Sequence, residues 1–449
     1  MNLLRFWKPR DIRSLYKVFL QDYISKISTE KKHLREKYWL NSEALLSHFN
    51  KENIPDNKIE EWKNFKTGFL KKTNWKIPEL KNKKVQVDKK IKVTENSLFF
   101  VHGRYNSKIS KAGNTKGLNV FSTYEYFKLN PSYKEKVYSN PEKYMEDRLS
   151  GIGDKKTTAL IALNSLLNHG TVIEIEKEAK ISNPINIINL SIDETSQLLI
   201  SPYIIIICKQ NSEAIFTEKT YTKNCWINGL SEIYLEKNAK LTYSKFQASI
   251  DNSIQTSSLN CSLKNKSNLD LKIFNRENCK EDIRVFLNDE KASAKISGII
   301  TSKERKESDV YCKVVHNGKQ TFSDQSWRLL SSDSSKTSVN GKIRVNRLAK
   351  FSAASFSSKS LILSDKASSF SKPELEILED DVKCKHGASF GEIDKNLLFY
   401  MQSRGIKKQD AIFTLVNAFL SEIGFKKFDI EEIVLKSIKE FFNIGNANE

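Results

Sequence analysis

A cysteine and a histidine separated by one residue form the pair of side chains in this sequence with the clearest metal-ligating chemistry. Cys384 and His386 lie in the stretch Asp-Asp-Val-Lys-Cys-Lys-His-Gly, where lysines alternate with other residues. Side chains two apart on a strand point to the same face. A thiolate and an imidazole are both ligands for iron and iron–sulfur clusters. The spacing predicts two ligands on one face of an extended segment, which are too few to complete a metal site.

The segments around this pair predict a strand followed by a helix. Leu375 and Ile377 alternate with glutamates, as in a half-buried strand. We expect Gly387 to end the extended segment, and Ser389 or Asp394 to begin the next helix. The pair would then lie at the end of a strand.

The sequence shows few residue patterns typical of catalysis, and the Cys-x-His pair also has a structural interpretation. An arbitrary Cys-x-His is more often a buried cysteine beside a surface histidine than a ligand pair. The adjacent Asp380 and Asp381 would point to opposite faces of a strand, so we interpret them as structural rather than as an acid–base pair. No Ser-His-Asp or nucleophile-elbow pattern occurs. The remaining histidines have no ligand spacing: His33, His48, His102, His169 and His316.

The sequence pattern predicts a long region of short strands between two helical regions. Residues 1–170 carry mainly helical patterns, residues 171–385 hold many strand-sized segments about ten residues apart, and residues 386–449 are predicted to be helical. Such strands fit a sandwich, a barrel or a solenoid. Few two-residue hairpin turns separate them, which favours a parallel β-helix capped by helices. Periodicity alone leaves sandwich and solenoid nearly even.

Net charge and cysteine content bear on whether this chain binds nucleic acid and in which compartment it works. The net charge is +20, but only 13 of the 74 basic residues are arginine, and the lysines are spread along the chain. We therefore favour a solvated basic surface over nucleic-acid binding, with an acidic partner as the alternative. No apolar run is long enough to span a membrane. The six scattered cysteines and the lack of a secretory signal predict a cytoplasmic protein.

The region around the Cys-x-His pair also resembles a known family. Its blocks Lys-Pro-Glu-Leu-Glu-Ile, Asp-Asp-Val-Lys-Cys, His-Gly-Ala, Leu-Phe-Tyr and Ser-Arg-Gly-Ile, within residues 372–406, are similar to the C-terminal signature of the SufB/SufD family, and of its SufD members in particular. Further upstream the match is partial, because Ala353–Ser358 lacks the Asp and Gln usual at that point.

The resemblance implies a fold, partners and cargo. It implies a right-handed parallel β-helix between N-terminal and C-terminal helical regions, in a non-catalytic scaffold subunit of the SufBCD iron–sulfur cluster assembly complex. SufB would pair with the β-helix, and a transient cluster would form at that interface near His386, Cys384 and, as a minor candidate, His316. The ATPase SufC would bind the C-terminal helices through Leu398, Phe399, Tyr400, Arg404 and Gly405.

Two rival hypotheses remain at this point. The first is a self-sufficient homodimeric scaffold that holds a cluster without SufB. The second is a β-helix carbohydrate-active enzyme, which would need acidic and basic side chains along one groove. The sequence shows no such arrangement, so the enzyme is the weaker rival.

Overall fold

The structure, a computed structural model, describes residues 42–78, 87, 91, 93–111, 115–134, 136–137, 157–168, 170–191, 197–423, 438–439 and 441–442. The chain divides into two compact units, which are described separately. One comprises Met1–Trp75 and Phe121–Thr171, and the other Lys76–Val120 and Val172–Glu449. Within the expected helical regions, residues 1–41 and 424–437 lie outside the described residues.

The first unit is mainly helical in its described part. Its helices are α3 (Ser42–Glu52), a 3-10 turn (Glu60–Trp62), α4 (Gly68–Lys72), α5 (Thr123–Leu129), α6 (Pro131–Lys134) and α8 (Thr157–Leu167). α3 packs against α8, and His48 Nε2 lies 2.8 Å from Thr158 Oγ1. Trp62 and Trp75 are buried and contribute to the core of this unit.

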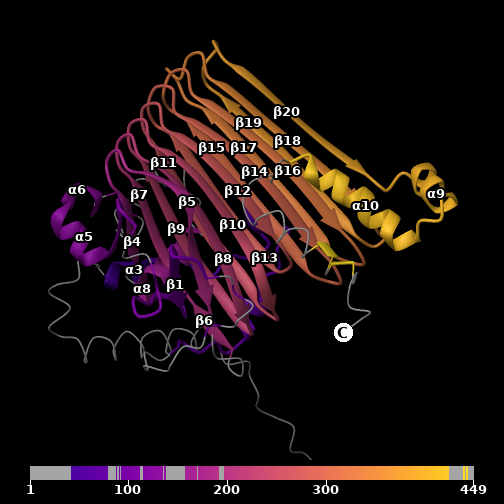
Figure 1. Cartoon of the computed structure of the whole chain (residues 1–449), viewed down its shortest axis with the longest axis horizontal. Helices are drawn as coiled ribbons and strands as arrows, with labels where there is room; N and C mark the ends of the chain where they lie inside the picture. The colour runs from indigo at the N-terminus through magenta and orange to yellow at the C-terminus, as the bar shows by residue number, and fades with distance from the viewer. Residues whose placement is uncertain are drawn as a thin grey trace, which may run out of the picture. The chain divides into compact units, whose positions relative to one another are not determined.

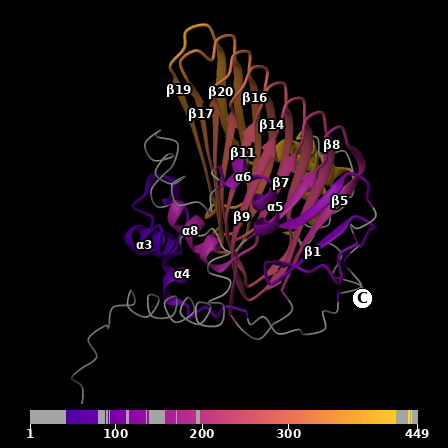
Figure 2. The same cartoon turned by 90° about the vertical axis from the view of Figure 1, so that its left-hand side faces the viewer.

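The second unit is a parallel β-solenoid of about seven turns, which confirms the expected fold class. One sheet, here called the β20 sheet, has the order β2-β1-β5-β8-β10-β12-β14-β16-β18-β20. The other, the β19 sheet, has the order β19-β17-β15-β13-β11-β9-β7-β4-β3, with β6 also paired to β9. Figure 1 shows the strands stacked in order along the chain, and Figure 2 shows the two layers from the side. Their bounds are β1 (Ser97–Val101), β2 (Arg104–Tyr105), β3 (Leu118–Ser122), β4 (Thr171–Ile175), β5 (Lys180–Leu190), β6 (Leu198–Ile200), β7 (Tyr203–Cys208), β8 (Glu213–Lys223), β9 (Cys225–Leu235), β10 (Lys240–Asp251), β11 (Ile254–Leu263), β12 (Asn268–Asn275), β13 (Cys279–Leu287), β14 (Ser293–Ser302), β15 (Glu307–His316), β16 (Phe322–Ser331), β17 (Lys336–Val345), β18 (Ala353–Ile362), β19 (Ser368–Ile377) and β20 (Lys383–Gly391).

The core lies between the two sheets and is built from columns of stacked side chains. Because parallel strands pair in register about 4.8 Å apart, each inward residue rests on its counterpart in the previous coil. One such column in the β19 sheet is almost wholly apolar: Ile206, Ile233, Cys261, Val285, Val314, Ile343 and Leu375. Burial of these columns holds the coils together, since a single coil has no core of its own.

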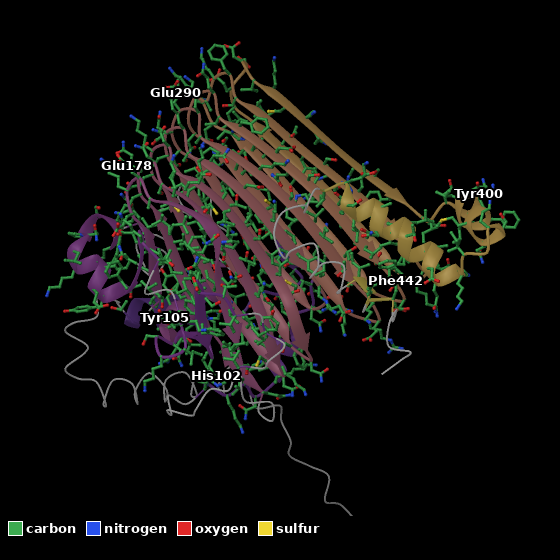
Figure 3. The ribbon with its side chains drawn as sticks, viewed as in Figure 1. His102, Tyr105, Glu178, Glu290, Tyr400 and Phe442 are labelled. Atoms are coloured by element: carbon green, nitrogen blue, oxygen red, sulfur yellow. The ribbon has the colours of Figure 1, made fainter. Side chains whose placement is uncertain are left out.

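A second set of contacts forms at the corner of each coil. A residue with positive φ turns the chain there, and its main-chain N–H donates to a carbonyl of the next coil. These corner residues are Glu178, Asn211, Asn238, Lys266, Lys291, Gln320 and Phe351. Figure 3 labels Glu178 and, in a later turn along the same edge, Glu290. A side-chain ladder runs beside them, with Asn317 Nδ2 bonded to Asn288 Oδ1 (2.9 Å) and Asn346 Nδ2 bonded to Asn317 Oδ1 (2.6 Å).

Two helices follow the last strand. α9 (Lys395–Ser403) lies beyond the strand ends, whereas α10 (Lys408–Ser421) packs on the outer face of the β20 sheet (Figure 1). Val416 and Leu420 pack with an apolar cluster on that face: Phe246, Phe274, Ile299, Leu330 and Leu361. Arg328 Nη2 also donates to Glu422 Oε2 at 2.7 Å, just after the helix, and so fixes α10 to the sheet.

The structural units differ from the expected boundaries in two places. Strands β1 and β3 belong with the solenoid although they lie within residues 1–170. β20 also runs through the expected boundary at residue 385, and Gly387, expected to end the strand, pairs with Ser357 in its middle. The reason is that Ala388 and Phe390 continue the alternation, so the pairing with β18 extends to Gly391. Asp394 does begin the next helix as predicted, since its side chain caps α9.

Candidate functional site

Cys384 and His386 lie on β20, the last strand of its sheet. In register, Cys384 pairs with Ala354 and His386 with Phe356, both of which are buried in the solenoid core. Two residues along a strand span about 6.6 Å, so both donors project from the same face at neighbouring positions. The prediction that the strand period places them together is therefore confirmed.

The position of β20 at the edge decides how accessible the two groups are. In the described part of the chain, no strand pairs with the far edge of β20 or with that of β19, the last strand of the other sheet. Cys384 is half-buried against the core, and His386 is exposed. Neither group is enclosed within the fold, so a second chain can reach this edge.

The partial burial of Cys384 affects the ionisation of its thiol. It raises the pKa of the Cys384 thiol above its ordinary value, which favours the protonated form at neutral pH. A bound cation would offset that cost, because a metal-bound thiol loses its proton. Metal binding at Cys384 should therefore release a proton and weaken as the pH falls.

The same edge carries partly exposed apolar side chains, of which the sequence analysis did not single out Phe390. Pro373, Leu375 and Ile377 on β19 and Phe390 on β20 occupy core-facing positions of the last coil, yet Ile377 is 41% and Phe390 52% exposed. Their interior counterparts in earlier coils are buried, so these side chains resemble a core layer without its covering coil. Continued alternation after Gly387 was the sequence signal that could have identified Phe390.

The described part of the chain supplies no third donor for a metal site at this edge. Among the described residues, no group of three or more histidine, cysteine, aspartate or glutamate side chains could hold a metal ion. Asp380 and Asp381 lie in the turn before β20, and the main-chain carbonyl of Asp381 accepts a hydrogen bond from the Phe351 N–H (2.7 Å). That contact supports their interpretation as structural residues.

His316 is a core residue and not a ligand at this edge. It is completely buried, and its two ring nitrogens lie 2.8 Å from Thr321 Oγ1 and 2.8 Å from Ser323 Oγ. Burial lowers the pKa of His316 to about 4, so the ring is neutral at physiological pH. Both nitrogens are occupied, which leaves no lone pair for a metal.

The residues expected to bind an ATPase lie on α9 and its C-terminal turn. α9 has no buried residue, and Phe399 is 73% and Tyr400 54% exposed. Figure 3 shows Tyr400 on α9, beyond the strands. Arg404 stacks 5.3 Å from the Tyr400 ring centroid, and its Nη2 donates to the Tyr400 hydroxyl at 3.2 Å. Leu398 is half-buried.

Gly405 has a structural role in that segment. Its φ is +85°, and it follows the Arg404 cap of α9. The Gly405 N–H donates to Gln402 and the Ile406 N–H to Met401, which is the Schellman pattern that ends a helix. A glycine adopts this conformation at the lowest cost, which explains the Arg-Gly-Ile sequence.

Within the described residues, no helix has the length and apolarity needed to cross a membrane.

Comparison with known proteins identifies the family. Residues 191–419 match the model of the SUF system FeS cluster assembly SufBD core domain. An iron–sulfur cluster assembly SufBD family protein of Synechocystis is 23% identical over 319 residues, which cover 67% of this chain and 69% of that protein. SufD of Bacillus subtilis is 23% identical over 307 residues, or 67% and 68% of the two chains. SufD of Escherichia coli is 34% identical over 137 residues, or 30% and 32%. The chain belongs to the SufBD family of iron–sulfur cluster assembly proteins.

Proposed function

We propose that this chain is a SufD-type, non-catalytic scaffold subunit that pairs with SufB through the open end of its solenoid. The observation that carries the proposal is the position of Cys384 and His386 on an unpaired edge strand. Two ligands from this chain and further ligands from SufB would together hold a transient iron–sulfur cluster, which is the cargo of the complex. A shared site of this kind can release its cluster when the two chains separate.

The open end of the solenoid supports the pairing. Among the described strands, none pairs with the outer edge of β19 or of β20, and such an edge offers main-chain N–H and C=O groups to which a strand of another chain can add. Exposed Ile377 and Phe390 would be buried at the same time. At about 25 cal/mol per Å², covering such side chains contributes favourably to association.

α9 supports a second contact, with the ATPase SufC. Its exposed Phe399 and Tyr400 are the aromatic side chains typical of interface centres. Three residues, Glu392 to Asp394, connect β20 to α9. We infer that ATP-driven movement of SufC would be transmitted to β20 through this short link and would open or close the cluster site.

Single substitutions on β20 test the cluster site. The tagged full-length chain is co-expressed with SufB and SufC, purified without oxygen, and supplied with iron and sulfide. His386→Ala should retain SufB and SufC but lower the cluster content measured by absorption spectroscopy and iron analysis, and Cys384→Ala should have a smaller effect. Lys385→Ala is the matched control, because Lys385 lies between them and points to the opposite face.

Substitutions on α9 test the second contact. Phe399→Ala with Tyr400→Ala should abolish retention of SufC and leave SufB bound. Unchanged cluster content in both β20 variants would refute the ligand role of the pair. Failure of the unaltered chain to retain SufB would refute the pairing itself, and a stable cluster on the isolated chain would instead favour the homodimeric scaffold.

A further inference from the structure

The interior face of one strand, β16, is polar where the preceding coil is aliphatic. Gln325 and Trp327 point into the core from β16. At the same register on β14 lie Ile296 and Gly298. The Trp327 ring occupies the space above Gly298, since a Cβ on that glycine would lie 2.0 Å from the ring. An amide and an indole therefore replace an aliphatic layer inside the solenoid.

These two side chains are buried without hydrogen-bond partners among the described residues. Gln325 and Trp327 both have 0% exposure. Neither Oε1 nor Nε2 of Gln325 is hydrogen-bonded, and Nε1 of Trp327 is not either. By contrast, Ser323, two residues earlier on the same face, is bonded to His316 at 2.8 Å.

The cost of leaving these groups unpaired is large. Each buried donor or acceptor without a partner costs about 1–3 kcal/mol. Gln325 and Trp327 together present three such atoms. Their summed free-energy penalty is comparable with a large part of the stability of a typical domain. Buried water commonly satisfies such groups, provided that several polar atoms converge on it.

We propose that the solenoid interior binds one or two water molecules between Gln325 and Trp327. Water is the ligand that suits the site, because it both donates to the amide oxygen and accepts from the amide and indole N–H groups. The surroundings favour retention of the water. Phe356 stacks on Gln325 in the next coil, and its ring reaches the space beside Gly341 on the opposite sheet. Phe356 therefore lies between the proposed water and exposed His386.

The direct test is a crystal structure of the full-length chain at a resolution that shows ordered water. Density within about 3.2 Å of a Gln325 amide atom and of Trp327 Nε1 is the expected result. An interior without such density, or a Gln325 amide bonded to protein atoms instead, would overturn the proposal.

Unfolding measurements give an independent test, because the stability change on removing the Gln325 amide has opposite signs for a hydrated and a dry interior. Gln325→Met keeps the length of the side chain but removes the amide. If the amide holds water, the folding constant measured by urea unfolding should fall about fivefold relative to a control. If the amide is dry and unpaired, its removal should raise the constant. The control is Ile296→Met, which places the same side chain one coil lower in the same column and measures the cost of repacking alone.

Discussion

The buried histidine gives a prediction whose magnitude follows from the structure. His316 stands in a column that also contains Cys208, Leu235, Leu263, Leu287, Val345 and Ile377. Its neutral ring accepts or donates hydrogen bonds with Thr321 and Ser323, and its burial excludes the charged form. Replacing it by leucine removes the titrating group while matching the residue one coil below.

The size of the pH effect follows from the two pKa values of this group. Burial lowers the pKa of His316 to about 4 in the folded chain, whereas an unfolded histidine has a pKa of about 6.5. Between these values the unfolded chain binds more protons, so stability falls as the pH falls. Linkage gives a loss of about 2 kcal/mol between pH 7 and pH 5, and of about 3 kcal/mol by pH 4, where the effect levels off.

The assay is urea unfolding of the wild-type chain and of His316→Leu at pH 7 and pH 5, followed by circular dichroism. The variant is expected to be less stable at pH 7, because Ser323 loses its partner. Its loss of stability on acidification should be about 2 kcal/mol smaller than that of the wild type. Val345→Ala, next in the column, lowers stability without removing a titrating group and should keep the wild-type pH dependence. Equal pH dependence in the wild type and His316→Leu would refute the reasoning.

Two further predictions concern the solenoid itself. Lys245 Nζ lies 2.6 Å from Glu281 Oε1 in the interior. Lys245→Met should therefore lower the free energy of unfolding by about 3–5 kcal/mol, because it leaves a buried carboxylate without its ion-pair partner. Adding Glu281→Gln should recover much of that loss in urea unfolding, and equal stability of the single and double variants would contradict this. Phe351 has a φ of +60° and is 65% exposed, whereas two equivalent corners carry asparagine. Phe351→Asn should therefore raise the unfolding free energy by about 1 kcal/mol, and Lys266→Phe at another corner should lower it, because a positive φ costs more for phenylalanine than for asparagine. An unchanged urea midpoint for both variants would contradict this conformational cost.

Local sequence patterns determined the parts of this protein that depend on neighbours in the chain. Strand-sized segments about ten residues apart located the strand region, and period-two alternation placed Cys384 and His386 on one face. The cap at Asp394 was likewise predicted, because it depends on hydrogen bonds within a few residues, and the helix end at Gly405 depends on equally local bonds. Periodicity alone did not distinguish a solenoid from a sandwich. The family resemblance, which the SufBD core match confirms, predicted the solenoid that the structure shows.

Tertiary structure decided the properties that depend on residues far away in the chain. The same alternation occurs in buried and in edge strands, so the sequence could not show that β20 is the last strand of its sheet and leaves His386 exposed. His316 and Gln325 also carried no local sign of their burial, since each is covered by side chains from other coils, about 30 residues away. Stacking between coils sets which polar groups are enclosed and which remain open to a partner, and that stacking is a property of the assembled solenoid.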